Sequence, residues 1–143
     1  MINKKKFNDL TLEELYNIYK LRSEVFCLEQ EIVCVDPDKY DLLSTHYFLK
    51  DEKGIYAYLR LIDKDAKFKN ECSIGRLCVR LDMRKKGYAR MLMEQAIIDA
   101  DGDIRISGQA YLKEAYESMG FKIVSDTYFE EGILHFELFY GKH

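Results

Sequence analysis

A basic loop that ends in a glycine is the feature of this sequence best suited to chemistry. The strand-like segment Leu77-Cys78-Val79 precedes it, and the run Arg84-Lys85-Lys86-Gly87-Tyr88-Ala89-Arg90 opens a segment of helical periodicity. A helix start exposes unpaired backbone N–H groups and the positive end of the helix dipole, so it can bind a phosphate that the backbone approaches closely. Gly87 permits that approach, and Ala89 does not obstruct it.

The charge around this turn supports an anion site. Arg84, Lys85, Lys86 and Arg90 each oppose the helix dipole by about 0.3–1 kcal/mol unless an anion binds. The formal net charge of the chain is -3, which argues against a general nucleic-acid binder and makes the basic cluster a local feature. A solvated basic run on the surface is the alternative interpretation. We predict a diphosphate site at this turn.

Two motifs in this half of the chain resemble signatures of the GNAT acetyltransferase superfamily. Its acetyl-CoA loop has the pattern Gln/Arg-x-x-Gly-x-Gly/Ala after a strand, and Arg84, Gly87 and Ala89 occupy the matching positions. Its second signature, Asn-x-x-Ala-x-x-Phe-Tyr-x-x-x-Gly-Phe, is similar to residues 109–121, where the tyrosine (Tyr116), the glycine and the final phenylalanine keep their spacing. The departures from this signature are Gln109 for Asn, Leu112 for Ala and Ala115 for Phe.

The resemblance implies a site for acetyl-CoA as a co-substrate, without a metal. Backbone amides of residues 85–90 would hold the pyrophosphate, and the backbone of residues 77–79 would bond the pantetheine arm. Tyr116 would lie near the thioester sulfur and give a proton to the departing CoA thiolate. An acylated Cys78 is the alternative, but its position in a strand favours a core thiol. The residues expected to bind the coenzyme are Leu77, Cys78, Val79, Arg84, Lys85, Lys86, Gly87, Tyr88, Ala89, Arg90 and Gln109.

The N-terminal half resembles the ElaA-like branch of the same superfamily. Residues 22–30 carry its pattern Arg-x-x-Val-Phe-x-x-Glu-Gln, and similar segments lie at 57–60, 74–76 and 132–135. Leu134 stands where the relatives have proline. The resemblance covers nearly the whole chain, and it implies an N-acetyltransferase that moves an acetyl group to a primary amine by direct attack in a ternary complex.

Charged residues in and near the expected strands are candidates for the acceptor site. Arg60 and Arg76 each interrupt an apolar strand, and a guanidinium within a sheet needs a carboxylate, for which we expect Glu29. Such a network either ties the helix to the sheet or binds an acceptor that carries a carboxylate or phosphate. His46, His135 and Glu29 are candidate bases for the amine, and a water chain is the alternative. The candidate acceptor residues are Arg22, Glu29, His46, Arg60, Arg76 and His135.

These residues need a scaffold of strands and helices. Thr11 with Glu14 predicts a capped helix, and Gly87 and Gly120 mark a helix start and a helix end. The order β-α-β-β-β-α-β-α-β-β predicts an α/β (α+β) fold in one domain, residues 1–143, with a GNAT-like mixed, mostly antiparallel sheet of six to seven strands flanked by helices. We expect strands at 2–7, 46–49, 55–62, 71–80, 104–107 and on both sides of 130–132, helices at 11–28, 87–100 and 110–119, and an acidic loop at 31–44.

The composition limits the remaining possibilities. Hydrophobic residues make up 48% and charged residues 33% of the chain, as in ordinary globular proteins. No apolar run reaches signal-peptide or transmembrane length, so we expect a cytoplasmic protein whose four cysteines are reduced thiols rather than zinc ligands. The aromatic final strand, residues 136–140, offers an edge for a homodimer.

Two other functions are alternatives at this point. The domain could bind acetyl-CoA without turnover, as a sensor or interaction module, although such a module would not need Tyr116 in register with the coenzyme loop. A dinucleotide-binding domain is a weaker alternative, because Lys85 and Arg90 occupy positions where its motif needs the outer glycines.

Overall fold

Eight strands form one mixed sheet in the computed structural model, which describes residues 1–31 and 35–142. The strand order is β1-β2-β3-β4-β5-β8-β6, and β7 also pairs with β8. Every pairing is antiparallel except that of β4 with β5. The strands are β1 (Asn3–Lys6), β2 (Ser44–Asp51), β3 (Gly54–Ile62), β4 (Glu71–Val79), β5 (Asp103–Gln109), β6 (Lys122–Ile123), β7 (Tyr128–Glu130) and β8 (Ile133–Tyr140).

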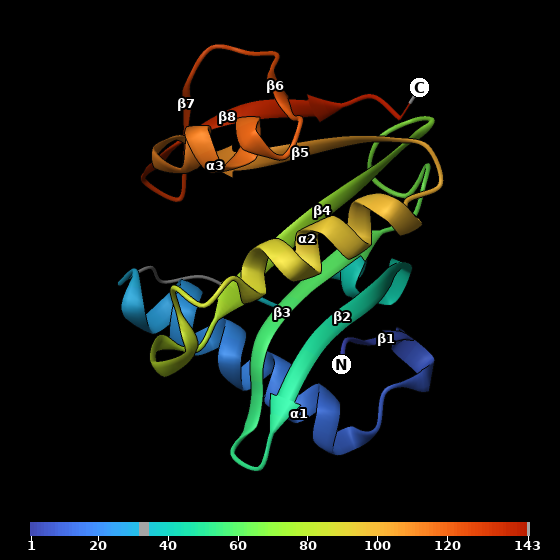
Figure 1. The fold of residues 1–143 in the computed structure, drawn as a ribbon, viewed down its shortest axis with the longest axis vertical. Helices are drawn as coiled ribbons and strands as arrows, with labels where there is room; N and C mark the ends of the chain where they lie inside the picture. Colours follow the sequence, from blue (N-terminus) through green and yellow to red (C-terminus); the bar gives the residue numbers. More distant parts are fainter. Residues whose placement is uncertain (32–34, 143) are drawn as a thin grey trace.

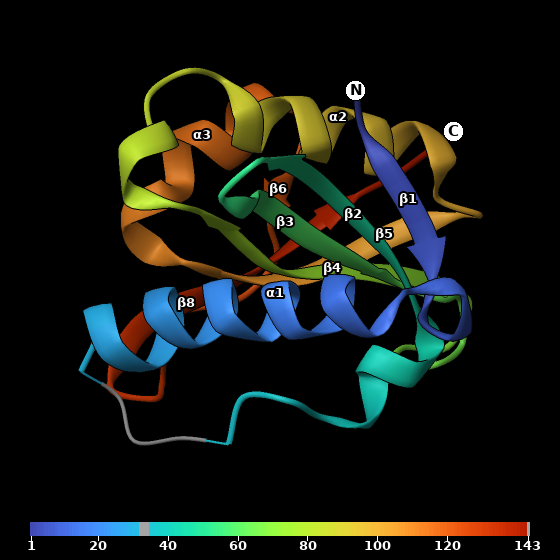
Figure 2. The ribbon, with the colours of Figure 1, turned by 90° about the horizontal axis from the view of Figure 1, so that it is seen from below.

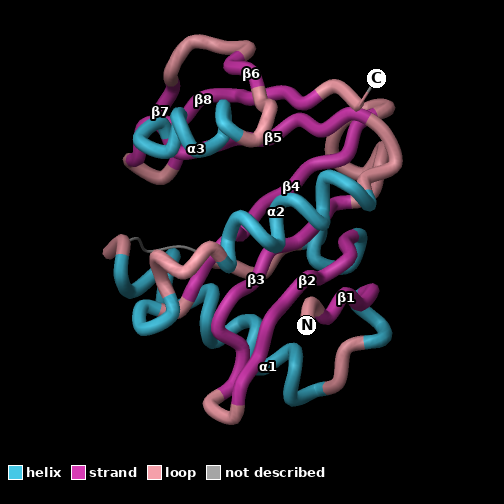
Figure 3. The backbone as a smooth tube through the Cα atoms, in the orientation of Figure 1, coloured by secondary structure: helices cyan, strands magenta, loops and turns pink. Residues whose placement is uncertain are grey.

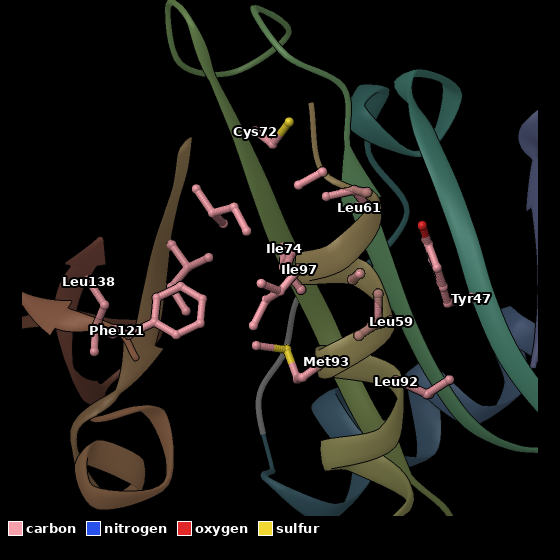
Figure 4. Close-up of a cluster of buried hydrophobic side chains, with 14 of the residues drawn as sticks. Tyr47, Leu59, Leu61, Cys72, Ile74, Leu92, Met93, Ile97, Phe121 and Leu138 are labelled. Atoms are coloured by element: carbon pink, nitrogen blue, oxygen red, sulfur yellow. The ribbon is translucent and has the colours of Figure 1, made fainter. Parts of the chain in front are cut away.

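Helices cover both faces of this sheet, with α1 on one face and α2 and α3 on the other (Figure 2). The larger hydrophobic core lies between the sheet and α2, and it includes Leu59 and Met93 (Figure 4). A smaller core, which includes Ile18 and Tyr58, lies on the α1 face. The helices are α1 (Leu12–Arg22), α2 (Tyr88–Asp99) and α3 (Lys113–Ser118).

Local signals in the sequence set the starts of both long helices. The Thr11 Oγ1 accepts a hydrogen bond from the Glu14 N at 3.0 Å, and a Glu14 carboxylate oxygen accepts one from the Thr11 N at 2.9 Å, so the predicted cap is confirmed. The helix continues through a π-helix, η2 (Ser23–Glu29), which agrees with the predicted length. Gly87 is the N-cap of α2, as predicted.

The C-terminal third departs from the prediction. The expected helix 110–119 begins as a 3-10 turn, η5 (Ala110–Leu112), and only the rest is α3. The expected strand before 130–132 is split into β6 and β7, and between them the Ser125 Oγ accepts a hydrogen bond from the Glu137 N at 2.9 Å. Since β8 lies between β5 and these two short strands, the expected free edge at residues 136–140 is wrong.

The strands β4 and β5 diverge along their length (Figure 1, Figure 3). Within the described sheet they pair only at Glu71 with Asp103 and at Cys72 with Ile104. Further along, β4 carries an irregularity in its register with β3, and Arg76 there has a positive φ of 53°. The sheet is therefore open between the carboxyl-terminal parts of β4 and β5.

Candidate active site

A cleft of about 630 Å³ lies where β4 and β5 diverge. This volume falls within the range typical of small-molecule sites, roughly 300–1,000 Å³. Three candidates, Arg22, His46 and Lys86, are absent from its lining. The candidates that line it are Glu29, Arg60, Arg76, Leu77, Cys78, Val79, Arg84, Lys85, Gly87, Tyr88, Ala89, Arg90, Gln109, Tyr116 and His135.

The turn before α2 faces open space. Gly87 has φ 85° and Lys85 has φ 62°, so the backbone makes two left-handed steps before the helix. A Cβ added at Gly87 would meet no atom within 4 Å. Among residues 1–31 and 35–142, neither Lys85 nor Lys86 has a carboxylate partner, whereas the Arg90 Nε lies 3.6 Å from a Glu94 oxygen. The helix N-terminus and two ammonium groups are thus available to an anion.

Arg84 is held by the end of β4 and by the π-helix η2. Its Nε donates to the Val79 carbonyl at 2.8 Å, and its two terminal nitrogens donate to the Glu29 carboxylate at 2.7 and 2.8 Å. The Arg84 hydrogen bonds lower the pKa of Glu29, so that carboxylate is ionised and engaged. The expected pairing of Glu29 with Arg60 and Arg76 is therefore wrong.

The backbone of β4 presents alternate residues to the gap. The Arg80 N donates to the Tyr56 carbonyl at 2.7 Å, and Cys78 is in register with β3, so these residues bond toward β3. Leu77 and Val79 accordingly direct their backbone groups toward the gap. The Cys78 side chain is buried on the α1 face, and burial raises the pKa of its thiol. A buried protonated thiol is a poor nucleophile, which argues against the acylated-cysteine alternative.

Tyr116 packs beside the strand that forms the other edge of the gap. Its ring stands edge-on to Phe121, with centroids 6.0 Å apart and an interplanar angle of 76°. Burial raises the pKa of its phenol to about 12, so the hydroxyl keeps its proton at neutral pH. No hydrogen-bond partner for this hydroxyl occurs in the described part of the chain. The hydroxyl is therefore available to a bound molecule.

Gly108 provides the room for the Tyr116 ring. A Cβ at position 108 would lie 2.8 Å from the Tyr116 Cε2 and 2.7 Å from the Leu138 Cδ1. We expect Gly108→Ala to displace the ring and lower kcat about 10²-fold, since a shift of about 1 Å can cost that much. The measurement is steady-state thiol release, with Gly141→Ala as the matched control because its Cβ would meet the Phe139 ring at an ordinary 3.5 Å. Equal rates for the two variants would contradict the prediction.

Three arginines and three aspartates form a compensated network between the sheet, α1 and the acidic loop. Arg22 and Arg60 both reach Asp41, at 2.7 and 2.9 Å. This geometry favours the interpretation that the arginines tie the helix to the sheet, because every guanidinium has a carboxylate of its own chain. The sequence marks the loop as acidic but does not assign these partners. The other pairs are Arg22 with Asp36 at 2.7 Å, Arg60 with Asp38 at 2.5 Å, Arg76 with Asp36 at 2.8 Å and Arg76 with Asp38 at 3.6 Å.

The two histidine candidates occupy different environments. His46 is 1% exposed, and its ring nitrogens lie 2.5 Å from the Tyr58 hydroxyl and 2.9 Å from the Asp41 carbonyl. Burial lowers the pKa of His46, which keeps the ring neutral and structural. His135 lines the cleft, with its Nε2 3.6 Å from a Glu130 carboxylate oxygen. Glu130 is not among the residues predicted from the sequence, although its position at the hairpin turn 130–132 could have indicated it.

A model of the acetyltransferase (GNAT) domain family matches residues 38–139, more than half of the chain. The chain belongs to the GNAT acetyltransferase family. A UPF0039 protein of Schizosaccharomyces pombe is 40% identical over 141 residues, which cover 94% of this chain and 92% of that protein. The protein ElaA of Escherichia coli is 29% identical over 135 residues, or 90% of this chain and 88% of that one. The predicted superfamily and its ElaA-like branch are confirmed.

Solved GNAT structures share the whole fold. An acyl-CoA N-acyltransferase from Pseudomonas aeruginosa superposes with a TM-score of 0.90 at 32% identity, covering 99% of both chains. The crystal structure of Escherichia coli ElaA gives a TM-score of 0.89 at 26% identity, covering 98% of both chains. The chain is therefore a GNAT-type N-acetyltransferase with the expected mixed sheet flanked by helices.

Two further expectations concern metals and membranes. In the ranges 1–31 and 35–142, no group of three or more His, Cys, Asp or Glu side chains could hold a metal ion. Across the same ranges, no helix has both the length and the apolar character needed to cross a bilayer. Cys34 and residues 32–34 of the predicted acidic loop lie outside the described residues.

Proposed function

We propose that the chain transfers an acetyl group from acetyl-CoA to a primary amine by direct attack in a ternary complex, in the cytoplasm. One observation carries the proposal: the cleft between β4 and β5 is lined by both the open turn at Gly87 and Tyr116, whose hydroxyl has no hydrogen-bond partner among the described residues.

The residues of the gap fit the parts of this donor. The amides at the start of α2, with Lys85 beside them, suit the pyrophosphate. The outward backbone groups of Leu77 and Val79 suit an amide-containing arm laid along β4 as an additional strand. Because the Val79 carbonyl already accepts from Arg84, we assign Arg84 to holding the loop in place.

Bound acetyl-CoA would supply a thioester whose carbonyl carbon accepts the amine. Tyr116 acts as the general acid that protonates the departing sulfur, because its raised pKa keeps the phenol protonated at neutral pH. The backbone of β4 orients the pantetheine arm of the donor. The amine and the thioester carbonyl then react from fixed positions within one complex and not by an encounter in solution.

Calorimetric titration with CoA tests the donor site. The wild-type chain should bind CoA, and Lys85→Glu should weaken the affinity by about tenfold or more, because it places a carboxylate beside a diphosphate. Lys122→Glu, an exposed reversal of the same charge on β6, is the control and should leave the affinity unchanged.

A screen of amines with acetyl-CoA, followed by thiol release, tests the reaction itself. Release that requires both acetyl-CoA and an amine supports the proposal. A wild-type chain that takes up no CoA, or a complex with the coenzyme far from Gly87, would overturn it.

A further inference from the structure

We propose that His135 is the general base that takes a proton from the acceptor amine, with Glu130 as the residue that positions it and balances its charge. This inference rests on the proposed function and extends it to the acceptor side of the same cleft.

The hydrogen bonds of His135 define which nitrogen can accept a proton. Its Nδ1 lies 2.7 Å from the Ile133 carbonyl oxygen. A carbonyl can only accept, so Nδ1 carries the hydrogen and the neutral ring leaves the lone pair on Nε2. The side chain is 8% exposed, and the residue lines the cleft. The ring is therefore fixed as the tautomer that a base requires.

The other two candidate bases are occupied. Both ring nitrogens of His46 have partners inside the α1 face, and this residue does not line the cleft. Glu29 lines the cleft, but Arg84 holds its carboxylate at 2.7 and 2.8 Å and lowers its pKa. A carboxylate with a lowered pKa has little affinity for a proton. His135 is the candidate whose proton-accepting atom has no donor of the described chain bound to it.

The strand register places His135 across β5 from Tyr116. The Cβ direction of Gly108 points at the Tyr116 ring, so the next residue, Gln109, directs its side chain to the opposite face. His135 is in register with Gln109 and shares that face. An amine that enters from the α1 face therefore meets His135, while the sulfur departs toward Tyr116 on the other face.

Polar and charged side chains surround the His135 ring. Tyr128 of β7 stacks on it, with centroids 6.2 Å apart, and the Tyr128 hydroxyl lies 2.5 Å from the Ser107 Oγ of β5. The Glu130 carboxylate, 3.6 Å from Nε2, supplies a countercharge for the imidazolium formed when a proton arrives. The remaining charged groups of the same cleft lining are Arg60, Arg76, Lys67, Glu29, Arg84, Lys85 and Arg90.

The protons of the transfer balance without a further reactant. The ammonium of the acceptor gives one proton to the His135 Nε2, and the resulting amine forms the C–N bond as the C–S bond breaks. Tyr116 protonates the departing sulfur, the acceptor nitrogen loses its second proton to solvent, and solvent returns a proton to Tyr116. The imidazolium then releases its proton to solvent, so one amide, one thiol and one proton are the products.

Acceptors of high and low basicity distinguish a general base from a structural residue. Spermidine and an alanine-initiated tetrapeptide are protonated at neutral pH, whereas hydroxylamine is already a free base. With either amine, His135→Gln should lower kcat/KM about 10²-fold and remove the acidic limb of its pH profile. With hydroxylamine, the loss should be several-fold at most. Glu130→Gln should show the same pattern more weakly, and Glu131→Gln, an exposed neighbour, is the matched control.

An independent measurement does not depend on the acceptor. Nitrogen chemical shifts of His135 in the wild-type chain with CoA should show a protonated Nδ1 and an unprotonated Nε2. The opposite tautomer would overturn the inference, as would equal losses with hydroxylamine and the amines. If the wild-type chain binds CoA and turns over amines while His135→Gln remains fully active, the inference alone fails. Absence of CoA binding by the wild-type chain would instead overturn the proposed function.

Discussion

Replacing Tyr116 by phenylalanine should lower kcat about 10²- to 10³-fold and change the CoA affinity by less than about twofold. The substitution removes one oxygen and keeps the ring that packs on Gly108 and Phe121. The hydroxyl has no hydrogen-bond partner within residues 1–31 and 35–142, so its removal should cost little stability. On the proposed role, the variant loses the group that protonates the departing thiolate. That proton transfer takes place only in the transition state, so kcat falls while CoA binding is kept.

Steady-state thiol release and calorimetry with CoA measure the two halves of this prediction. Tyr16→Phe is the control, since Tyr16 is 65% exposed on α1 and does not line the cleft. A Tyr116→Phe variant with unchanged kcat would show that another group or water protonates the sulfur. Restored turnover with a thioester whose leaving thiol is more acidic would support the acid role directly, since such a thiolate needs less protonation.

Replacing Asp41 by alanine should destabilise the fold by about 3–5 kcal/mol. Asp41 is 1% exposed and accepts hydrogen bonds from Arg22 and Arg60, which are themselves buried. Those two guanidiniums lower the pKa of the Asp41 carboxyl, so it is ionised and offsets their charge. Removing it leaves three guanidiniums, those of Arg22, Arg60 and Arg76, with only the two carboxylates of Asp36 and Asp38. The network then carries one uncompensated positive charge, and burying an unpaired charge is among the largest costs a substitution can impose.

Urea denaturation gives the free energy of unfolding for this comparison. Asp82→Ala is the matched control, because Asp82 also pairs with an arginine, Arg80 at 2.7 Å, but its side chain is 49% exposed. The control should lose less than about 1 kcal/mol. If Asp41→Ala lost as little free energy of unfolding as Asp82→Ala, water would be solvating the charges of Arg22 and Arg60, and the network would contribute little to stability.

Local chemistry explains what the sequence could predict. The capped start of α1 needs only Thr11 and Glu14, and the start of α2 needs only the left-handed conformation that Gly87 adopts. The coenzyme loop is equally local, because a strand, a turn and a helix start are consecutive. The two helix starts were predicted correctly, since neighbouring residues determine them.

Long-range pairing explains what the sequence could not predict. The partners of Arg60 and Arg76 lie 22 and 40 residues away in the chain, and nothing local distinguishes Asp38 or Asp36 from Glu29. The same holds for His46 and His135. Both lie in strands, and only the sheet register shows that one ring is enclosed beneath α1 while the other borders the cleft.

The short contact between β4 and β5 has a thermodynamic consequence. Two residue pairs join the strands there, so the sheet lacks part of the ladder that would normally hold its two halves together. A molecule lodged between them supplies the missing bridge, and at one hundred times its Kd it adds about 2.7 kcal/mol to the free energy of unfolding. The melting temperature therefore reports whether the cleft is occupied. In a library of amines tested with CoA present, those that bind as acceptors would raise the melting temperature of the chain.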